Sequence, residues 1–287
     1  MPAIGRLLQY QTHWGPGHYY SPIPDTAHAL AVSRAQQDRF LPMQGIDLRD
    51  QEQLGLFEQL VAFMKESPFR NEEKSPSHRF FNNNGIYGYS DALVLESMIR
   101  LLRPSRIVEA GSGFTSALMM DVNSKYFGNA IQLEFIEPYP ERLFKLLSAA
   151  DKNQVRIHVQ GLQTVDLSTF SSLKNQDILF IDSSHVAKVG SDLLYLFFEI
   201  LPVLAPGVYI HFHDIFNNFE YPENHFTKYK GFGWNENYFL RAFLMNNPQY
   251  EVVLFTNYLD LKYSAQILHW MPDYPLRTGG QFWIRKR

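Results

Sequence analysis

From about residue 90 onward, short apolar runs alternate with segments of helical periodicity. Apolar runs of about four to eight residues are typical of strands buried on both faces, and the helical segments between them suit crossovers between parallel strands. Strands are predicted at 106–110, 131–136, 155–159, 177–181, 208–213, 251–257 and 281–285, and helices near 90–102, 116–127, 140–151, 190–204 and 235–246. The alternation predicts an α/β fold with a Rossmann-like, doubly wound and mostly parallel seven-stranded sheet.

The two ends of the chain depart from this alternation. No convincing helical period joins the last two strands, so we expect the last strand to be antiparallel. Residues 1–85 are polar and rich in turns, with one helix expected at 51–66, where apolar side chains recur at helical spacing. We therefore expect an N-terminal helical and loop cap over 1–85 and a sheet domain over 86–287.

Composition excludes several classes of protein. The 26 basic and 29 acidic side chains give a net charge of −3, which disfavours nucleic-acid binding. The chain has no cysteine, which excludes disulfides and thiolate metal sites. Its longest apolar stretch, 193–210, is interrupted by Glu199, Pro202 and Pro206, so no membrane span is expected. The first residues lack a signal-peptide pattern, which predicts a cytoplasmic protein. The apolar side of the helix expected near 234–247 is interpreted first as core packing and second as a dimer face, so a homo-oligomer stays open.

The first predicted strand ends in a glycine turn, Gly111-Ser112-Gly113, that leads directly into a helix. At this place in a parallel sheet, a ligand meets backbone N–H groups at a helix N-terminus. The G-x-G pattern by itself indicates only a tight turn. Glu137 strengthens the case for a nucleotide-binding site, because it lies 24 residues beyond Gly113 at the next strand end. A carboxylate there can accept both ribose hydroxyls.

Two further residues bear on the class of nucleotide. Glu109 ends the first strand, and an anion there would repel a pyrophosphate and favour the ammonium and sulfonium groups of S-adenosylmethionine. Ser116 occupies the third position of the dinucleotide fingerprint, where glycine or alanine is usual, which argues against NAD.

The segments RIVEAGSGFTSA (106–117), LEFIEP (133–138), DILFIDSSH (177–185) and PGVYIHFHDIF (206–216) occur together in this order. In order and spacing the chain resembles the class I S-adenosylmethionine-dependent methyltransferases, specifically bacterial small-molecule O-methyltransferases related to the catechol and macrolide-sugar enzymes. The resemblance covers about residues 85–287. It implies S-adenosylmethionine as the cofactor and a small hydroxylated molecule, of sugar or natural-product type, as the methyl acceptor.

The resemblance also implies which residues contact the cofactor. The turn would hold the methionine part, through Glu109, Gly111, Ser112, Gly113, Thr115 and Ser116. Glu137 would hold the ribose, and Asp182 and Ser183 would lie near the methyl group. Thr115 replaces a small residue usual in these enzymes. The phrase FFNNNGIYGYSDA (80–92) precedes the turn much as in these enzymes, so Tyr87 or Tyr89 would cover the cofactor.

Histidines and aspartates gather at the ends of two neighbouring strands. Asp182 and His185 follow the fourth strand, and His211, His213 and Asp214 follow or end the fifth. Alternation places His211 and His213 on one face, with His211 deeper, where a hydrogen-bonded core histidine is the favoured interpretation. Asp182, His185 and His213 are the predicted catalytic residues.

A metal ion is one of two interpretations of this cluster. The related enzymes hold one Mg²⁺, at positions that the resemblance maps onto Asp182, His213 and Asp214. Because histidine replaces a carboxylate at 213, either the case for Mg²⁺ is weaker, or Mn²⁺ or Fe²⁺ is preferred, or the site is metal-free and His185 or His213 accepts a proton.

Two other functions stay open at this stage. His185 or His211, together with His213 and Asp214, has the composition of a non-haem iron oxygenase site. The second alternative is a non-catalytic module that binds the cofactor. In either case the aromatic loop 216–238 and the segment 13–25 are candidate covers of the site, and the loop's Phe219, Tyr221, Phe232 and Trp234 would either contact substrate or anchor the loop to the core.

Overall fold

The computed structural model describes residues 13–36, 38–70, 72, 73, 75, 77–228, 232–276 and 279–287. The prediction about the start of the chain rests partly on residues 1–12, which lie outside the described residues. No helix within these ranges combines the length and the apolarity needed to cross a membrane.

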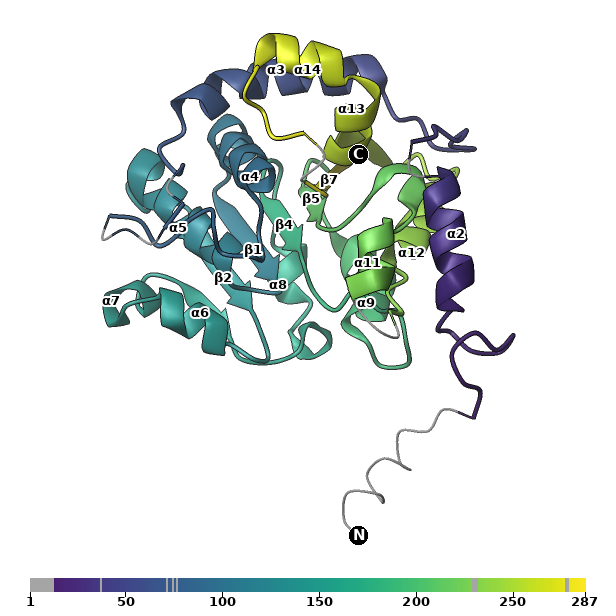
Figure 1. The fold of residues 1–287 in the computed structure, drawn as a ribbon. Coiled ribbons are helices and arrows are strands. Elements are labelled where there is room, and N and C mark those ends of the chain that lie inside the picture. The colour runs from purple at the N-terminus through teal and green to yellow at the C-terminus, as the bar shows by residue number, and fades with distance from the viewer. Residues whose placement is uncertain are drawn as a thin grey trace.

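One seven-stranded sheet forms the centre of the molecule, with strand order β3-β2-β1-β4-β5-β7-β6 (Figure 1). The strands are β1 (Arg106–Ala110), β2 (Gln132–Ile136), β3 (Arg156–His158), β4 (Ile178–Ile181), β5 (Tyr209–Phe212), β6 (Tyr250–Phe255) and β7 (Phe282–Lys286). Only β7 is reversed, because it pairs antiparallel with both β5 and β6. The predicted sheet and its antiparallel last strand are therefore confirmed.

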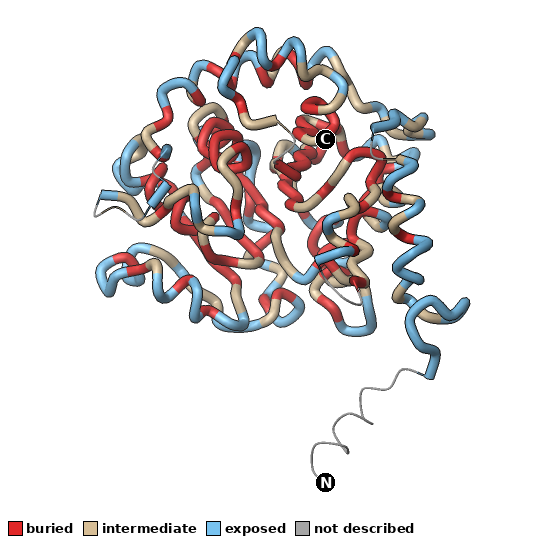
Figure 2. The backbone as a smooth tube through the Cα atoms, in the orientation of Figure 1, coloured by how far each residue is buried: buried red, intermediate tan, exposed pale blue. Residues whose placement is uncertain are grey.

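Consecutive residues of the central strands are buried, so both faces of the sheet are covered (Figure 2). In the register of β1 with its neighbours, Ala110 lies opposite Ile136 of β2 and Ile181 of β4. The carboxyl ends of these three strands are therefore level, and the segments that follow them meet at one edge of the sheet.

The helices expected at 51–66, 90–102, 116–127 and 235–246 are present, with ends that differ by at most a few residues. The helices of the structure are α2 (Thr26–Gln36), α3 (Asp50–Glu66), α4 (Tyr89–Leu102), α5 (Phe114–Phe127), α6 (Glu141–Leu146), α7 (Ala149–Lys152), α8 (Ser168–Ser171), α9 (Asp192–Tyr195), α10 (Leu201–Val203), α11 (Glu223–Lys228), α12 (Glu236–Leu244), α13 (Thr256–Lys262) and α14 (Ser264–Trp270). Short helical turns lie at Leu162–Thr164 (η1), Leu196–Ile200 (η2) and Asn217–Phe219 (η3). The turn η2 joins α9 to α10, so the helix expected at 190–204 has a π-helical middle.

Two expectations about helices were wrong. The segment before β7 does contain helices, α13 and α14, but each has only seven residues, which is too short to show a clear period in the sequence. The helix expected at 140–151 is interrupted, since Ser148 caps α7 with a hydrogen bond from the Asp151 amide.

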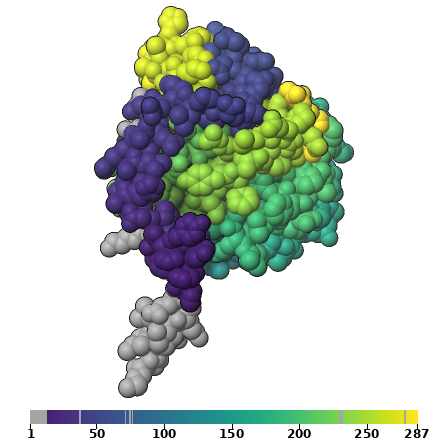
Figure 3. Space-filling model, turned by 90° about the vertical axis from the view of Figure 1, so that its right-hand side faces the viewer, coloured from purple at the N-terminus to yellow at the C-terminus, as the bar shows by residue number. Residues whose placement is uncertain are grey.

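The N-terminal region covers two parts of the sheet domain. Helix α3 packs against α4, β6 and α14, whereas α2 packs against α11. Figure 3 shows the N-terminal segment, in purple, running along one side of the molecule beside the green residues of the later chain. The domain boundary near residue 85 remains a prediction.

Gly111 sets the distance between the turn after β1 and the end of β4. Its φ is +87°, and a Cβ atom there would lie 1.7 Å from the backbone oxygen of Asp182. The two segments are also tied to the sheet by hydrogen bonds from the Gly111 amide to Ile136 and from the Asp182 amide to Ala110. Only glycine fits this position.

We expect Gly111→Ala to lower the free energy of unfolding by at least about 3 kcal/mol, because β1 and β4 would have to separate. Gly128→Ala is the matched control, since Gly128 also has a positive φ, +57°, but open space around it. We expect the control to cost only about 1 kcal/mol. Urea unfolding of both variants makes the comparison, and equal losses would refute the steric explanation.

Candidate functional site

A cavity of about 960 Å³ lies at the carboxyl ends of the strands. Along the sheet edge its lining passes from Gln163, after β3, to Glu137 after β2, Gly111 after β1, Asp182 after β4 and Asp214 after β5. We call this cavity the crevice. It therefore brings the glycine turn, the acidic residue of the second strand and the histidine and aspartate cluster into one continuous space.

Glu137 is held against the glycine turn by backbone donors. Its Oε2 accepts a hydrogen bond from the Ser112 amide at 3.1 Å, and its Oε1 accepts one from the Tyr139 amide at 2.8 Å. Ser112, Gly113 and Thr115 also line the crevice, as the sequence led us to expect. The carboxylate is thereby fixed in orientation, with further acceptor capacity on both oxygens.

Glu109 does not face the crevice, in contrast to the electrostatic role expected from the sequence. It is fully buried, and its two carboxyl oxygens are hydrogen-bonded to the hydroxyls of Thr115 and Ser116 in the first turn of α5. Burial raises the pKa of Glu109 to about 8, although the hydrogen bonds from Ser116 and Thr115 oppose this rise. Near neutral pH, Glu109 is therefore mostly uncharged, and it stabilises the turn through its hydrogen bonds to Thr115 and Ser116.

Ser116 and Tyr89 also lie away from the crevice lining. The Ser116 hydroxyl accepts a hydrogen bond from the Gly113 amide at 3.0 Å and so stabilises the turn. Tyr89 packs against the hydrophobic core at the start of α4. Of the two tyrosines considered as a cover, Tyr87 is the one that lines the crevice.

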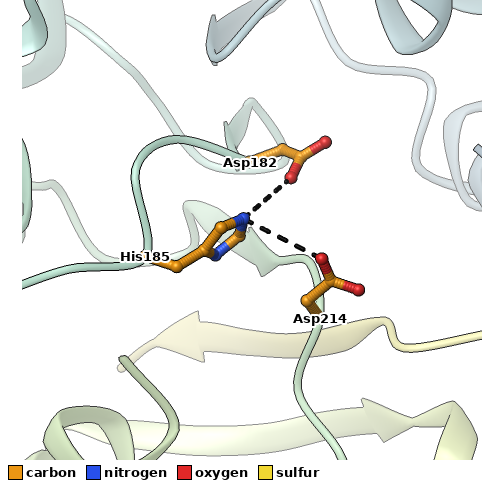
Figure 4. Close-up of side chains that lie close together, drawn as sticks. All are labelled: Asp182, His185 and Asp214. Atoms are coloured by element: carbon orange, nitrogen blue, oxygen red, sulfur yellow. Dashed lines mark ion pairs between the residues drawn. The ribbon is translucent and has the colours of Figure 1, made fainter. Parts of the chain in front are cut away.

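His185 lies between three carboxylates. Its Nδ1 is 2.6 Å from Oε2 of Glu236, and its Nε2 is 3.3 Å from Oδ1 of Asp182 and 3.9 Å from Oδ2 of Asp214 (Figure 4). The residue adopts a left-handed backbone with φ +59°, and its carbonyl accepts hydrogen bonds from the Asn235 and Glu236 amides at the start of α12. These contacts aim Nε2 at the two aspartates.

His213 reaches the same aspartates from the other side. Its Nδ1 lies 3.5 Å from Asp182 and 3.6 Å from Asp214, and its Nε2 lies 3.3 Å from Oδ2 of Asp91. Its ring also packs against Tyr87, with 5.1 Å between ring centroids. Each of the two histidines thus has one nitrogen near the aspartate pair and the other near a separate buried carboxylate.

His211 takes no part in this arrangement. It is fully buried, stacks on Phe180 at 3.9 Å between centroids and contacts the edge of Trp283. It is a core histidine, as expected, but neither ring nitrogen has a hydrogen-bond partner among the described residues, so the expected hydrogen bond is missing. Burial, aided by the nearby His213, holds its pKa well below the usual range, so His211 is neutral.

The cluster of two histidines and two aspartates is strongly coupled. Burial disfavours charge on His185, but its hydrogen bonds to Asp182 and Glu236 prevail and raise its pKa to about 10. Burial likewise opposes charge on His213, yet Asp214 and Asp182 raise its pKa. Burial would raise the pKa of Asp182, but His213 and His185 lower it. The site therefore favours cations next to the two aspartates.

One set of ligand atoms in the cluster lies close enough together to hold a metal ion. Asp182, His185 and Asp214 each offer one atom, all within 4.8 Å of one another, and the aspartates are 22% and 25% exposed. The expected set had His213 in place of His185. His213 Nδ1 lies at comparable distances, 3.5 and 3.6 Å, from the same two carboxylates, while its Nε2 lies near Asp91. His211 lies too deep for the iron site that was considered.

Sequence reasoning missed Asp91 and Glu236, the two carboxylates behind the histidines. Both stand in the first turn of a helix, where acidic residues are common for reasons of the helix dipole alone. The phrase YSDA (89–92) lies within a segment that the resemblance had marked, and this was the one available signal for Asp91.

Some aromatic residues of the loop 216–238 anchor it to the rest of the protein, and one lines the crevice. Tyr221, Phe226 and Phe232 form a small hydrophobic cluster with Ala29 of α2, which anchors the loop. Trp234 lines the crevice and packs on His185 with 4.3 Å between ring centroids. In the segment 13–25, Tyr19 and Tyr20 are exposed and line neither the crevice nor the cavity of about 740 Å³ beside it.

The buried state of Glu109 predicts a pH dependence of stability. Since its pKa is about 8 in the folded chain and about 4.5 when unfolded, the folded state binds the proton more tightly, so this contribution to stability is lost as pH rises from 5 through 8. Glu109→Gln keeps two hydrogen-bonding groups but does not titrate. We expect its free energy of unfolding, relative to the parent chain, to rise between pH 5 and pH 9, and a constant difference in urea unfolding would contradict the uncharged state.

Three comparisons with known proteins bear on the family. Residues 108–215, which hold the turn and most of the cluster, match a family model described as a methyltransferase domain. An uncharacterised protein from Archaeoglobus fulgidus is 35% identical over 171 residues, an alignment that covers 57% of this chain and 75% of the relative. Among solved structures, SAH-bound methyltransferase PaMTH1 from Podospora anserina is 14% identical, with 91% of this chain and 94% of that chain covered and a TM-score of 0.45.

A second structural match is the apo form of CmcI, which is 22% identical. It covers 45% of this chain and 53% of the CmcI chain, so this chain spans about half of its length, and the TM-score is 0.36. The match of residues 108–215 to the methyltransferase domain, on a seven-stranded sheet with one reversed strand, shows that the chain belongs to the class I S-adenosylmethionine-dependent methyltransferase family.

Proposed function

We propose that the chain transfers the methyl group of S-adenosylmethionine to a hydroxyl of a small molecule, with assistance from a divalent metal ion. The continuity of the crevice carries this proposal: it joins Glu137, a carboxylate suited to a ribose, to the aspartates and histidines at the end of β5. A cofactor that spans it would have its nucleoside near β2 and its sulfonium near β4.

The residues along the crevice fit such a cofactor. Glu137 is fixed by two backbone donors and keeps acceptor capacity for ribose hydroxyls. Gly111 leaves room for a close approach to the backbone. The Ser183 hydroxyl is buried beside Asp182 and has no hydrogen-bond partner among the described residues, so it is available to a bound group. Asp182 and Asp214, rather than Glu109, supply the negative charge that would favour a sulfonium.

The residues Asp182, His185 and Asp214 likewise fit a metal ion. The distances of 3.3 and 3.9 Å from His185 Nε2 to the two carboxylates are close to those between ligands that share one ion. Glu236, on the opposite nitrogen of His185, is the kind of carboxylate that orients a metal-binding histidine. An imidazole among carboxylates favours Mn²⁺, Fe²⁺, Co²⁺ or Zn²⁺ over Mg²⁺.

The chemistry needs positioning and the removal of one proton. A sulfonium methyl is already activated, so the rate depends on holding the acceptor oxygen in line with the methyl carbon. A bound divalent ion would supply Lewis acidity that makes the hydroxyl easier to ionise. Without a bound ion, burial opposes charge on His213, but Asp214 and Asp182 raise its pKa and favour its protonated form. With an ion bound to both aspartates, their charge would be offset, and His213 would then be placed to accept the proton through Nδ1, with Asp91 beside Nε2 of the resulting imidazolium.

Ribose recognition is tested by titrating S-adenosylhomocysteine into the protein by calorimetry. We expect Glu137→Ala to weaken binding by at least about tenfold, because two hydroxyl hydrogen bonds to a charged acceptor are lost. Glu141→Ala, an exposed change in the neighbouring α6, is the control and should leave the affinity unchanged. An absence of binding by the parent chain would refute the proposed function.

Metal binding is tested with Mn²⁺, followed by electron paramagnetic resonance in the presence of S-adenosylhomocysteine. We expect one tightly bound ion, no tight binding in Asp182→Asn or His185→Ala, and about 10- to 100-fold weaker binding in Glu236→Gln. Asp166→Asn, on the exposed surface, is the control. If the parent chain binds S-adenosylhomocysteine but no Mn²⁺, Fe²⁺, Co²⁺ or Zn²⁺, the proposal of a metal-assisted reaction is refuted. His185 then becomes a second candidate base.

A further inference from the structure

A second cavity, of about 740 Å³, opens beside the crevice. Tyr87, His213 and Asp214 line both cavities, so the two spaces meet at the histidine and aspartate cluster. The outer wall of the second cavity comes from α2 and α11, which pack together. We call it the side pocket. A molecule in it would reach the cluster from the side opposite to Glu137.

The lining of the side pocket is acidic and rich in amides. Its carboxylates are Asp38, Asp91, Asp214, Glu220 and Glu223. Its amides are Gln36, Asn82, Asn83, Asn217, Asn224 and Asn257. No lysine or arginine belongs to this lining within the described ranges. The pocket therefore offers many hydrogen-bonding groups and an excess of negative charge.

The charges within the side pocket are not all balanced. Glu223 is neutralised by Arg34 of α2, which binds both of its carboxylate oxygens. Asp91 and Asp214 lie beside His213. Glu220, by contrast, accepts hydrogen bonds from the Tyr238 hydroxyl at 2.6 Å and the Tyr221 amide at 3.0 Å, and forms no ion pair with a described residue. A negative charge held by neutral donors is suited to a cation from outside.

Asn217 supplies an independent sign of a ligand. The residue is buried, with its amide group fixed by a hydrogen bond from Nδ2 to the Arg39 carbonyl at 2.8 Å. Its Oδ1 is buried and has no donor among the described residues, although Asn217 lines the side pocket. An unpaired buried acceptor calls for a hydroxyl or ammonium donor.

We propose that the side pocket binds the methyl acceptor and selects a polyhydroxylated molecule that carries an amine, such as an amino sugar. The assignment rests on the proposed methyl transfer. Hydroxyls would bind the amides, the ammonium would lie near Glu220, and the reacting hydroxyl would face His213 and Asp214. Phosphorylated or carboxylated acceptors are disfavoured, because five carboxylates line the pocket and, within the described ranges, no lysine or arginine does.

The test uses three probes that share one ring and differ in charge: D-glucosamine, D-glucose and D-glucose 6-phosphate. Saturation-transfer NMR is recorded on protein saturated with S-adenosylhomocysteine, at slightly acidic pH, where the amine is protonated. We expect glucosamine to bind at least about fivefold more tightly than glucose, as one charge-assisted hydrogen bond predicts, and the phosphate to give no signal.

Glu220→Gln separates charge from shape, because it keeps an acceptor for Tyr238 and removes the charge. We expect it to abolish the preference for glucosamine over glucose and to leave the affinity for S-adenosylhomocysteine unchanged. Glu199→Gln, an exposed change that lines neither cavity, should preserve the preference.

Three outcomes would overturn the proposal: preferred binding of the phosphate, an unchanged preference in Glu220→Gln, or no signal from any sugar while S-adenosylhomocysteine binds. Failure of S-adenosylhomocysteine to bind would instead refute the proposed function, so the two failures are distinguishable.

Discussion

The close contact between the turn after β1 and the end of β4 is the constraint on which the site depends. Gly111 lies against the backbone of Asp182, with no room for a side chain. This contact places Ser112 beside Glu137 and fixes where Asp182 leaves the sheet. The nucleoside end of the crevice and its acidic end are therefore held at a fixed separation by backbone atoms.

The second level of organisation is the pairing of each histidine with a carboxylate from another element. Glu236 of α12 holds His185, and Asp91 of α4 lies behind His213. Buried charges of this kind are tolerated only when they are paired and hydrogen-bonded. The pairs leave one nitrogen of each histidine facing Asp182 and Asp214. The two histidines therefore present separate nitrogens for the two proposed roles, metal binding and proton transfer.

The N-terminal region contributes to the site through helix α2. Helix α2 contributes nothing to the sheet, yet it neutralises Glu223 and packs on the aromatic cluster of α11. It thereby closes the outer wall of the side pocket. Residues of the N-terminal region thus complete a pocket whose other walls, including His213 and Asp214, come from the sheet domain.

The sequence by itself determined the sheet, the reversed last strand, and the gathering of Gly111, Glu137, Asp182 and Asp214 at one edge, because apolar runs and strand ends are local features and parallel strands align their carboxyl ends. Only the tertiary structure decided that Glu109 turns inward and that both His185 and His213 face the two aspartates. It also supplied Asp91 and Glu236, which lie 122 and 51 residues from their histidines. Such pairings depend on how helices cross the sheet, and no local pattern of residues specifies that geometry.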